Sequence, residues 1–264
     1  LAYQLLFIFL ATGTDATIAL IGGADITANF RPRTMAISIG MLLSALAMTW
    51  HLVHFHYVKF NKESMYEVSK KIILLCIPLL LSAQFIAGIL NEALDLTDTN
   101  QELFISMSHN IFGVLSIAIV VPILEEVLFR GAIEGHLLRK GWSPKWAILV
   151  SALIFGIIHG NPAQIPFAFL IGLLFGWLYY RTGSLVPGIV GHIINNSFGA
   201  WTMFTATREE LSQTTMETLG TTITYILLVL AIIVFIGMYL YLNKYLPKPT
   251  NIQVKAINEQ DITI

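Results

Sequence analysis

The feature that most constrains this chain is a series of apolar windows, each about 20 residues long and almost free of charge. A helix needs that length to cross about 30 Å of hydrocarbon at 1.5 Å per residue. Charged residues make up 12% of the 264 residues, whereas a typical soluble domain carries about 25%. We therefore expect an integral membrane protein. Its net charge of −1 gives no general attraction for nucleic acid.

Eight apolar segments can be delimited, which predicts an all-α, polytopic membrane bundle of about eight transmembrane helices. Their expected bounds are 1–22, 35–56, 72–91, 107–130, 145–160, 163–181, 184–205 and 221–243.

The orientation is predicted from the basic residues in the connections, because cytoplasmic loops are enriched in Lys and Arg. One alternating set of connections holds eleven of them: Lys59, Lys62, Lys70, Lys71, Arg139, Lys140, Lys145, Arg181, Lys244, Lys248 and Lys255. The other set holds three, Arg31, Arg33 and Arg208, together with an acidic loop. This asymmetry predicts that both termini are cytoplasmic.

Ionisable residues inside an apolar segment are costly and are therefore functional candidates. Glu125, Glu126 and Arg130 follow the apolar run 115–124. Glu126 and Arg130 are four residues apart, so they share a helical face and are expected to pair. Glu125 points about 100° away and has no partner in its own helix, which suits a general base. The alternative is a helix end at which both glutamates reach the headgroup region.

Two further polar clusters follow. His159 ends the fifth segment directly before the turn 160–162. A lone histidine at a helix end is more often an interfacial residue than a catalyst. In the seventh segment, His192 and Asn196 share one face at a spacing of four residues. Polar residues of this kind also simply bond neighbouring membrane helices, so the spacing alone leaves both roles open.

The three clusters are expected to lie at one depth. Glu125 lies 14 residues before Arg139 and His159 lies 14 residues after Lys145, which places each roughly 21 Å from a cytoplasmic charge. His192 lies 11 residues after the basic end of the preceding segment, or roughly 17 Å.

One carboxylate, two imidazoles and an amide that meet in a water-accessible cavity would suffice to hydrolyse a peptide bond. Glu125 would deprotonate a water molecule, and His159 and His192 would position that water directly or through a metal ion. Asn196 would stabilise the developing oxyanion.

The order of these motifs carries a resemblance. EExxxR at 125–130, FxxxH at 155–159 and HxxxN at 192–196, on successive membrane helices, resemble the CAAX prenyl protease type II family, also called CAAX proteases and bacteriocin-processing enzymes. That family includes the Ras-converting endopeptidase and bacterial Abi-type proteins. The resemblance covers about residues 105–205, and it implies an eight-helix intramembrane endopeptidase.

The resemblance also implies roles for individual residues. It implies that Glu125 is the water-activating base with Glu126 and Arg130 as partners, that His159, His192 and Asn196 complete the catalytic set, and that Phe155 contacts substrate. The chain then divides into an N-terminal three-helix membrane region (1–104), a catalytic protease core (105–205), a last transmembrane helix (206–243) and a flexible cytoplasmic tail (244–264).

A metal ion is a second way to activate water. If a metal binds, its expected ligands are Glu125, His159 and His192, and zinc is the candidate. The motif HExxH is absent, and Cys76 is the only cysteine, which excludes a cysteine-based zinc site. No cofactor is therefore certain, and we expect a glutamate-activated water without a metal.

The main functional expectation is an endopeptidase that acts on a membrane-associated peptide or a lipid-proximal protein. The alternative is a non-catalytic immunity or scaffold protein of the same family, since Abi-type proteins are associated with bacteriocin self-immunity. A transporter is disfavoured, because segments one to three carry almost no charge and no inverted repeat is seen. The small size and short loops favour a bacterial cytoplasmic membrane. Partners beyond membrane lipids and substrate, and the oligomeric state, cannot be read from the sequence.

Overall fold

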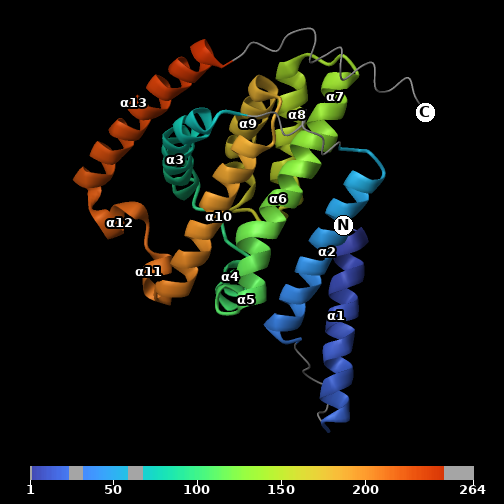
Figure 1. Cartoon of the computed structure of the whole chain (residues 1–264). Helices are drawn as coiled ribbons and strands as arrows, with labels where there is room; N and C mark the ends of the chain where they lie inside the picture. The colour runs from blue at the N-terminus through green and yellow to red at the C-terminus, as the bar shows by residue number, and fades with distance from the viewer. Residues whose placement is uncertain (1, 24–31, 59–67, 247–264) are drawn as a thin grey trace.

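The computed structural model describes residues 2–23, 32–58 and 68–246. Over these ranges the chain is helical, with no β-strand, and several helices are long and apolar enough to cross a membrane. The prediction of an all-α polytopic bundle is therefore confirmed (Figure 1). Most of the predicted tail, from residue 247 onward, lies outside the described residues. The same is true of five of the basic residues used to predict orientation, Arg31, Lys59, Lys62, Lys248 and Lys255.

The first three predicted segments form one helix each: α1 (Ala2–Ile21), α2 (Thr34–His54) and α3 (Lys70–Glu92). Helices α1 and α2 pack along each other at one side of the molecule (Figure 1). Near their shared end, the buried carboxylate of Asp15 accepts a hydrogen bond of 2.7 Å from the backbone N–H of Arg33 and forms an ion pair with its guanidinium. The pair neutralises an acid that would otherwise be unmatched inside an apolar helix.

The fourth segment differs from its expected bounds of 107–130. Met107 and Ser108 end a separate short helix, α4 (Gln101–Ser108), and the long helix begins after Asn110. The Asn110 side chain caps this start by accepting from the backbone N–H of Gly113 at 2.7 Å. A Cβ at Gly113 would lie 2.1 Å from the carbonyl oxygen of Met107, so the sharp turn requires glycine there.

The long helix continues to Arg139 and changes its winding twice. It comprises α5 (Ile111–Leu115), the π-helical turn η1 (Ser116–Val120), α6 (Val121–Glu126), the π-helical stretch η2 (Val127–Glu134) and α7 (Gly135–Arg139). π-Helical turns inside α-helices are rare and occur frequently at functional sites. Here they flank the two glutamates on both sides.

Three helices complete the core: α8 (Pro144–Ile158), α9 (Ile165–Thr182) and α10 (Val186–Thr205). Each has a proline in its first turn, where the missing N–H has no helical partner to lose. Gly183 ends α9 in the left-handed conformation, with φ of 66°. Helix α10 lies at the centre and contacts η1, α6, α3, α4 and α9 (Figure 1).

The chain closes with two short helices, α11 (Arg208–Ser212) and α12 (Thr215–Leu219), and then α13 (Thr221–Tyr245) packed on α3. Both short helices begin with a capping box, formed by Thr207 with Glu210 and by Thr214 with Glu217. They cover the end of the bundle where α10 ends (Figure 1).

Within the described residues, six helices are long and apolar enough to span a membrane: α1, α2, α3, the continuous helix from Ile111 to Arg139, α9 and α13. Helix α8 is apolar but has only 15 residues, and α10 carries the polar residues of the site. The number of eight spans therefore stays a prediction. Helices α1 and α13 leave most of their apolar surface exposed, as expected for a protein surrounded by lipid.

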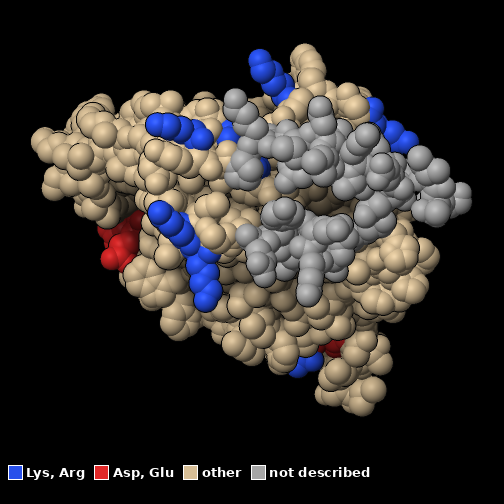
Figure 2. Space-filling model, turned by 45° about the horizontal axis from the view of Figure 1, so that its top comes forward, with Lys and Arg blue, Asp and Glu red and all other residues tan. Residues whose placement is uncertain are grey.

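The two ends of the bundle differ in charge. Seven described basic residues lie at the end where α7 terminates: Lys70, Lys71, Arg139, Lys140, Lys145, Arg181 and Lys244. Figure 2, which turns this end toward the reader, shows Lys and Arg over it and acidic side chains only at its edges. The opposite end holds α11, α12 and the loop before α4, where Glu92, Asp95, Asp98, Glu102, Glu209, Glu210 and Glu217 lie.

Candidate active site

The predicted pair of Glu126 and Arg130 is present and lies in the interior of the bundle. Arg130 Nη1 donates to Glu126 Oε1 at 3.0 Å, and the two residues are 1% and 0% exposed. Arg130 Nη2 donates to the backbone carbonyl of Gly172 on α9 at 3.2 Å. Its guanidinium carbon also lies 4.4 Å from the ring centre of Phe155, a cation–π contact. The cation is therefore held from three sides, and it fixes the position of the Glu126 carboxylate.

His192 on α10 lies between the two glutamates. Its Nδ1–H donates to Glu126 Oε1 at 3.1 Å, and its Nε2 lies 3.4 Å from Glu125 Oε2. His192 is 5% exposed, so both contacts are made in the interior. Because Glu126 accepts the hydrogen bond from Nδ1–H, Nε2 is the ring nitrogen that faces Glu125. Arg130, Glu126, His192 and Glu125 thus form one continuous polar chain.

Adjacent glutamates have different surroundings in this arrangement. Glu125 lines a cavity, whereas Glu126 lies behind it and does not reach the cavity wall. Gly188 on α10 makes room for Glu126, since a Cβ there would lie 2.6 Å from Glu126 Oε2. The side chain that could meet a substrate is therefore Glu125, and Glu126 orients His192.

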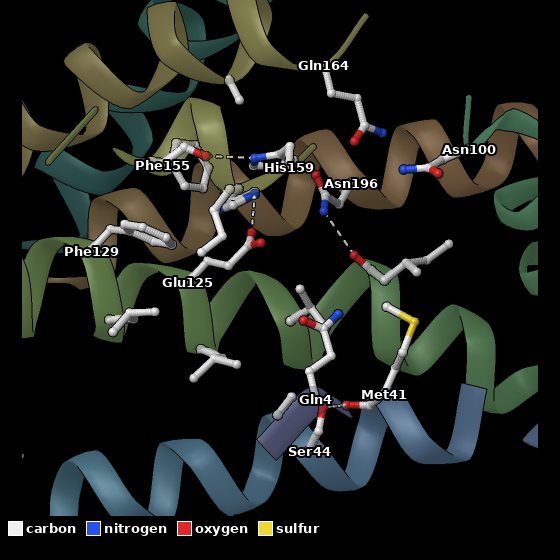
Figure 3. A pocket seen from close by; sticks show the side chains of 18 of the residues that line it. Gln4, Met41, Ser44, Asn100, Glu125, Phe129, Phe155, His159, Gln164 and Asn196 are labelled. Atoms are coloured by element: carbon white, nitrogen blue, oxygen red, sulfur yellow. Dashed lines mark hydrogen bonds and ion pairs between the residues drawn. The ribbon is translucent and has the colours of Figure 1, made fainter. Parts of the chain in front are cut away.

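His159 enters the same cavity from the end of α8. Its Nδ1–H donates to the backbone carbonyl of Phe155 at 2.8 Å, which leaves Nε2 as the acceptor nitrogen of a neutral ring. The Phe155 ring packs edge-on against it, with ring centres 4.9 Å apart. Figure 3 shows Glu125 and His159 directed toward one space from different helices. Phe155, predicted to contact substrate, lines this cavity, is 2% exposed, and packs on Arg130 and His159.

Asn196 lies one helical turn beyond His192 and is also on the cavity wall. Its Nδ2 donates to the backbone carbonyl of Ile117 at 2.9 Å, and its Oδ1 accepts from Asn195 Nδ2 at 3.0 Å. Ile117 belongs to η1, so this π-helical turn presents a carbonyl to α10. The bond fixes the Asn196 amide and uses one of its two N–H groups, which leaves the second for an oxyanion. The predicted oxyanion role stays a prediction.

The cavity has a volume of about 500 Å³. Helices α6, α8 and α10 contribute Glu125, His159, His192 and Asn196, and α1, α2 and α4 supply much of the remaining wall. The first hundred residues carry no recognisable motif, so the sequence did not predict that α1 and α2 line the site. It also missed the cavity amides Gln4, Asn100 and Gln164, which belong to none of the motifs.

A second buried acid was not assigned a role from sequence. Glu134 lies two turns after Glu126, is 0% exposed, and faces Gly176 on α9, where a Cβ would lie 2.7 Å from its Oε2. Neither carboxyl oxygen has a hydrogen-bond partner among the described residues. The spacing of four from Arg130 was the only available signal. Gly172 and Gly176, which are one turn apart on α9, thus lie next to Arg130 and Glu134, which are also one turn apart on their own helix.

The sequence of the segment that forms this site matches a known protein family. Residues 107–198 match the family described as type II CAAX prenyl endopeptidase Rce1-like. This segment belongs to the Rce1-like family. All seven residues of the predicted site lie within the Rce1-like segment: Glu125, Glu126, Arg130, Phe155, His159, His192 and Asn196.

Several bacterial proteins are similar over part of their length. The putative membrane peptidase YdiL of Bacillus subtilis (strain 168) is 38% identical over 81 residues, which cover 31% of this chain and 33% of YdiL. The membrane-embedded CAAX protease MroQ of Staphylococcus aureus (strain USA300) is 33% identical over 106 residues, or 38% of this chain and 42% of MroQ.

The UPF0177 protein YxdF of Lactococcus lactis subsp. lactis (strain IL1403) is 28% identical over 122 residues, or 46% of this chain and 63% of YxdF. The chain therefore matches less than two thirds of the length of each of these relatives. No solved structure matches.

The zinc ligands predicted for this site are Glu125, His159 and His192. Among the described residues, no three His, Cys, Asp or Glu side chains come together closely enough to hold a metal ion. Glu125 and His192 lie within 3.4 Å of each other, but His159 does not complete a ligand set with them. The residues as arranged do not fit a zinc site.

Proposed function

We propose that this integral membrane protein is an endopeptidase in which Glu125 activates a water molecule to hydrolyse a peptide bond. The observation that carries the proposal is the polar chain that ends at the cavity. Arg130 holds Glu126, Glu126 orients His192, and His192 Nε2 lies 3.4 Å from Glu125 Oε2. The carboxylate at the end of this chain is the one that faces the cavity.

The proposed reaction needs only groups of this site. Glu125 takes one proton from water while the oxygen attacks the scissile carbonyl carbon. The resulting oxyanion is stabilised by the second N–H of Asn196. The protonated Glu125 is held by His192 Nε2 and then gives its proton to the leaving nitrogen as the C–N bond breaks. His159 Nε2 positions the water on the opposite side of the cavity.

The substrate class follows from the location of the site and from the relatives. We propose a membrane-associated peptide or the lipid-proximal part of a protein, because Glu125 lies inside a segment long and apolar enough to span a membrane. The names of two relatives, a putative membrane peptidase and a membrane-embedded CAAX protease, support proteolysis. All three relatives are bacterial, which supports a bacterial cytoplasmic membrane as the location.

We also propose that the basic end of the bundle faces the cytoplasm. Seven described basic residues lie at that end, and the opposite end holds Arg33 and Arg208 among the described residues. A cluster of basic residues at one end is the pattern expected of the cytoplasmic side.

The deciding experiment compares Glu125→Gln with a matched control, Glu209→Gln, which changes an exposed glutamate of α11 that does not line the cavity. Peptides released from membranes of cells that carry wild type, either variant or His159→Ala are measured by mass spectrometry. We expect Glu125→Gln and His159→Ala to abolish specific products and Glu209→Gln to retain them, with equal membrane insertion for all. Unchanged products from Glu125→Gln and His159→Ala would contradict proteolysis and favour a non-catalytic immunity or scaffold role.

A further inference from the structure

Of the three carboxamide side chains that lie outside the catalytic motifs and line the same cavity as Glu125, two come from loops between helices. Asn100 comes from the loop before α4, and Gln164 comes from the loop before α9. Figure 3 shows both amides directed toward the space that Asn196 and His159 also face. Neither side chain caps the helix that follows it, although each occupies the capping position. Both residues are partly buried and line the cavity.

A buried asparagine holds the two loops together. Asn161 is 0% exposed, its Oδ1 accepts from the backbone N–H of Thr99 at 3.1 Å, and its Nδ2 donates to Asp98 Oδ1 at 2.7 Å. The same Asp98 oxygen accepts from the backbone N–H of Asn100 at 2.8 Å. The backbone N–H of Gln164 donates to the carbonyl of Asn161 at 2.9 Å. Asn100 and Gln164 are therefore fixed relative to each other across the two loops.

The wall of the cavity that α2 and α4 form is mostly apolar, with Ser44 as a polar side chain among its residues. Helices α2 and α4 contribute Met41, Ala45, Met48, Leu103 and Phe104. Among the described residues that line the cavity, Glu125 is the only Asp, Glu, Lys or Arg. The described lining thus offers no Lys or Arg side chain for the terminal carboxylate of a peptide or for an acidic side chain. Such a cavity suits an internal, uncharged stretch of chain.

Carboxamides provide what such a stretch lacks. An extended segment in an apolar cavity leaves its backbone N–H and C=O groups unpaired, which is costly. A helical segment satisfies most of these groups itself. Each Asn or Gln side chain presents a donor and an acceptor without charge, and so can pair with an extended backbone.

Resting on the proposed endopeptidase function, we propose that Asn100 and Gln164 form a backbone-binding subsite for an extended, uncharged and apolar peptide segment. The segment lies with its apolar side chains against α2 and α4. The part of the segment that contacts Asn100 and Gln164 lies away from the scissile bond, toward the end of the bundle that carries α11 and α12.

The test uses the full chain in lipid nanodiscs and a pool of internally quenched decapeptides with uncharged, apolar central residues. The variants are Asn100→Leu, Gln164→Met and their combination. The matched control is Gln101→Met, because Gln101 adjoins Asn100 but bonds the carbonyl of Leu211 and does not line the cavity. KM and kcat are measured for each peptide that is cleaved.

We expect each single variant to raise KM by about three- to tenfold and the double variant by about 10- to 100-fold, since each loses one or two hydrogen bonds. The value of kcat stays within about twofold, because the lost contacts form equally in the ground and transition states. N-methylation of the peptide nitrogen that donates to the Asn100 or Gln164 side chain should weaken binding to wild type. The same methylation should have no further effect on the variant that lacks that side-chain amide. A loss of fold would not produce this peptide-specific coupling.

Binding to the Glu125→Gln protein, followed by fluorescence anisotropy, separates this inference from the proposed function. If peptides bind Glu125→Gln through both amides but wild type does not cleave them, the proposed endopeptidase function is refuted and the backbone-binding subsite is supported. Cleavage by wild type with KM unchanged in the double variant would overturn the subsite. If wild type cleaves no peptide in the pool and Glu125→Gln binds none, the assignment of an extended peptide as the ligand is overturned.

Discussion

Replacing Gly188 by alanine tests the polar chain without altering any of its members. A Cβ at this position would lie 2.6 Å from Glu126 Oε2, and an ordinary contact begins at 3.4 Å, so the carboxylate must move by about 0.8 Å. The other oxygen of this carboxylate accepts from Arg130 at 3.0 Å and from His192 at 3.1 Å. A shift of that size takes at least one of these bonds beyond hydrogen-bonding distance.

The expected magnitude follows from these bonds. A hydrogen bond to a charged group contributes about 1.5–3 kcal/mol. Alanine in place of glycine inside a helix returns about 0.5–1 kcal/mol. We therefore expect Gly188→Ala to lower the free energy of unfolding by about 1–2 kcal/mol. Cleavage falls at least about tenfold, because general acid–base catalysis contributes about 10²–10⁴-fold and depends on the orientation of His192.

The control is the same substitution elsewhere on α10. A Cβ at Gly199 meets nothing within 4 Å, so Gly199→Ala should retain full activity and equal or slightly higher stability. Cleavage rates in nanodiscs and thermal unfolding in detergent are compared for both variants. Equal activity of Gly188→Ala and Gly199→Ala would refute the argument that the Glu126 carboxylate must stay where Arg130 and His192 hold it.

Three other outcomes are expected. Arg130→Met should lower the free energy of unfolding in detergent by about 3–5 kcal/mol, because Glu126 stays buried without its cation; a loss below about 1 kcal/mol would contradict this. Treatment with 1,10-phenanthroline should leave cleavage unchanged if Glu125 activates water alone, whereas complete loss that added Zn²⁺ reverses would favour a metal. Hydrogen bonds from the backbone N–H and the hydroxyl of Thr207 hold the pKa of Glu210 below its ordinary value of 4.5. The capping of α11 should therefore be fully present above pH 4.5 and be lost as the pH falls through that lowered pKa, which hydrogen exchange of the α11 amides measures; loss of protection already at pH 6 would contradict it.

Some features of the site depend on neighbours within one helix, and these follow directly from the sequence. The pairing of Glu126 with Arg130 is one, because a spacing of four residues brings side chains together on any α-helix. The lack of a partner for Glu125 in its own helix is another. The apolar windows likewise predict the long helices, since their length and hydropathy depend on composition alone. The predicted bounds of the fourth segment, 107–130, follow the apolar run alone, whereas the helix begins at Ile111 and continues through the polar residues after Arg130 to Arg139.

Contacts between helices could not be derived in this way. That His192 inserts between two adjacent glutamates depends on how closely α10 approaches α6, which Gly188 permits. That Asn196 bonds the carbonyl of Ile117 depends on a π-helical turn that no motif announces. Asn100 and Gln164 meet at one cavity only because Asn161 joins their loops.

The amino-acid sequence alone therefore predicts a helical membrane protein with paired polar residues on its fourth segment and two further polar clusters, at His159 and at His192 with Asn196. The tertiary structure alone decided which glutamate faces the cavity, which one orients the histidine, and which walls surround them. The two sources of information differ in the distance along the chain over which the underlying interactions act. Helical periodicity relates residues up to one or two turns apart, whereas packing of separate helices depends on small residues and hydrogen bonds between segments distant in the chain.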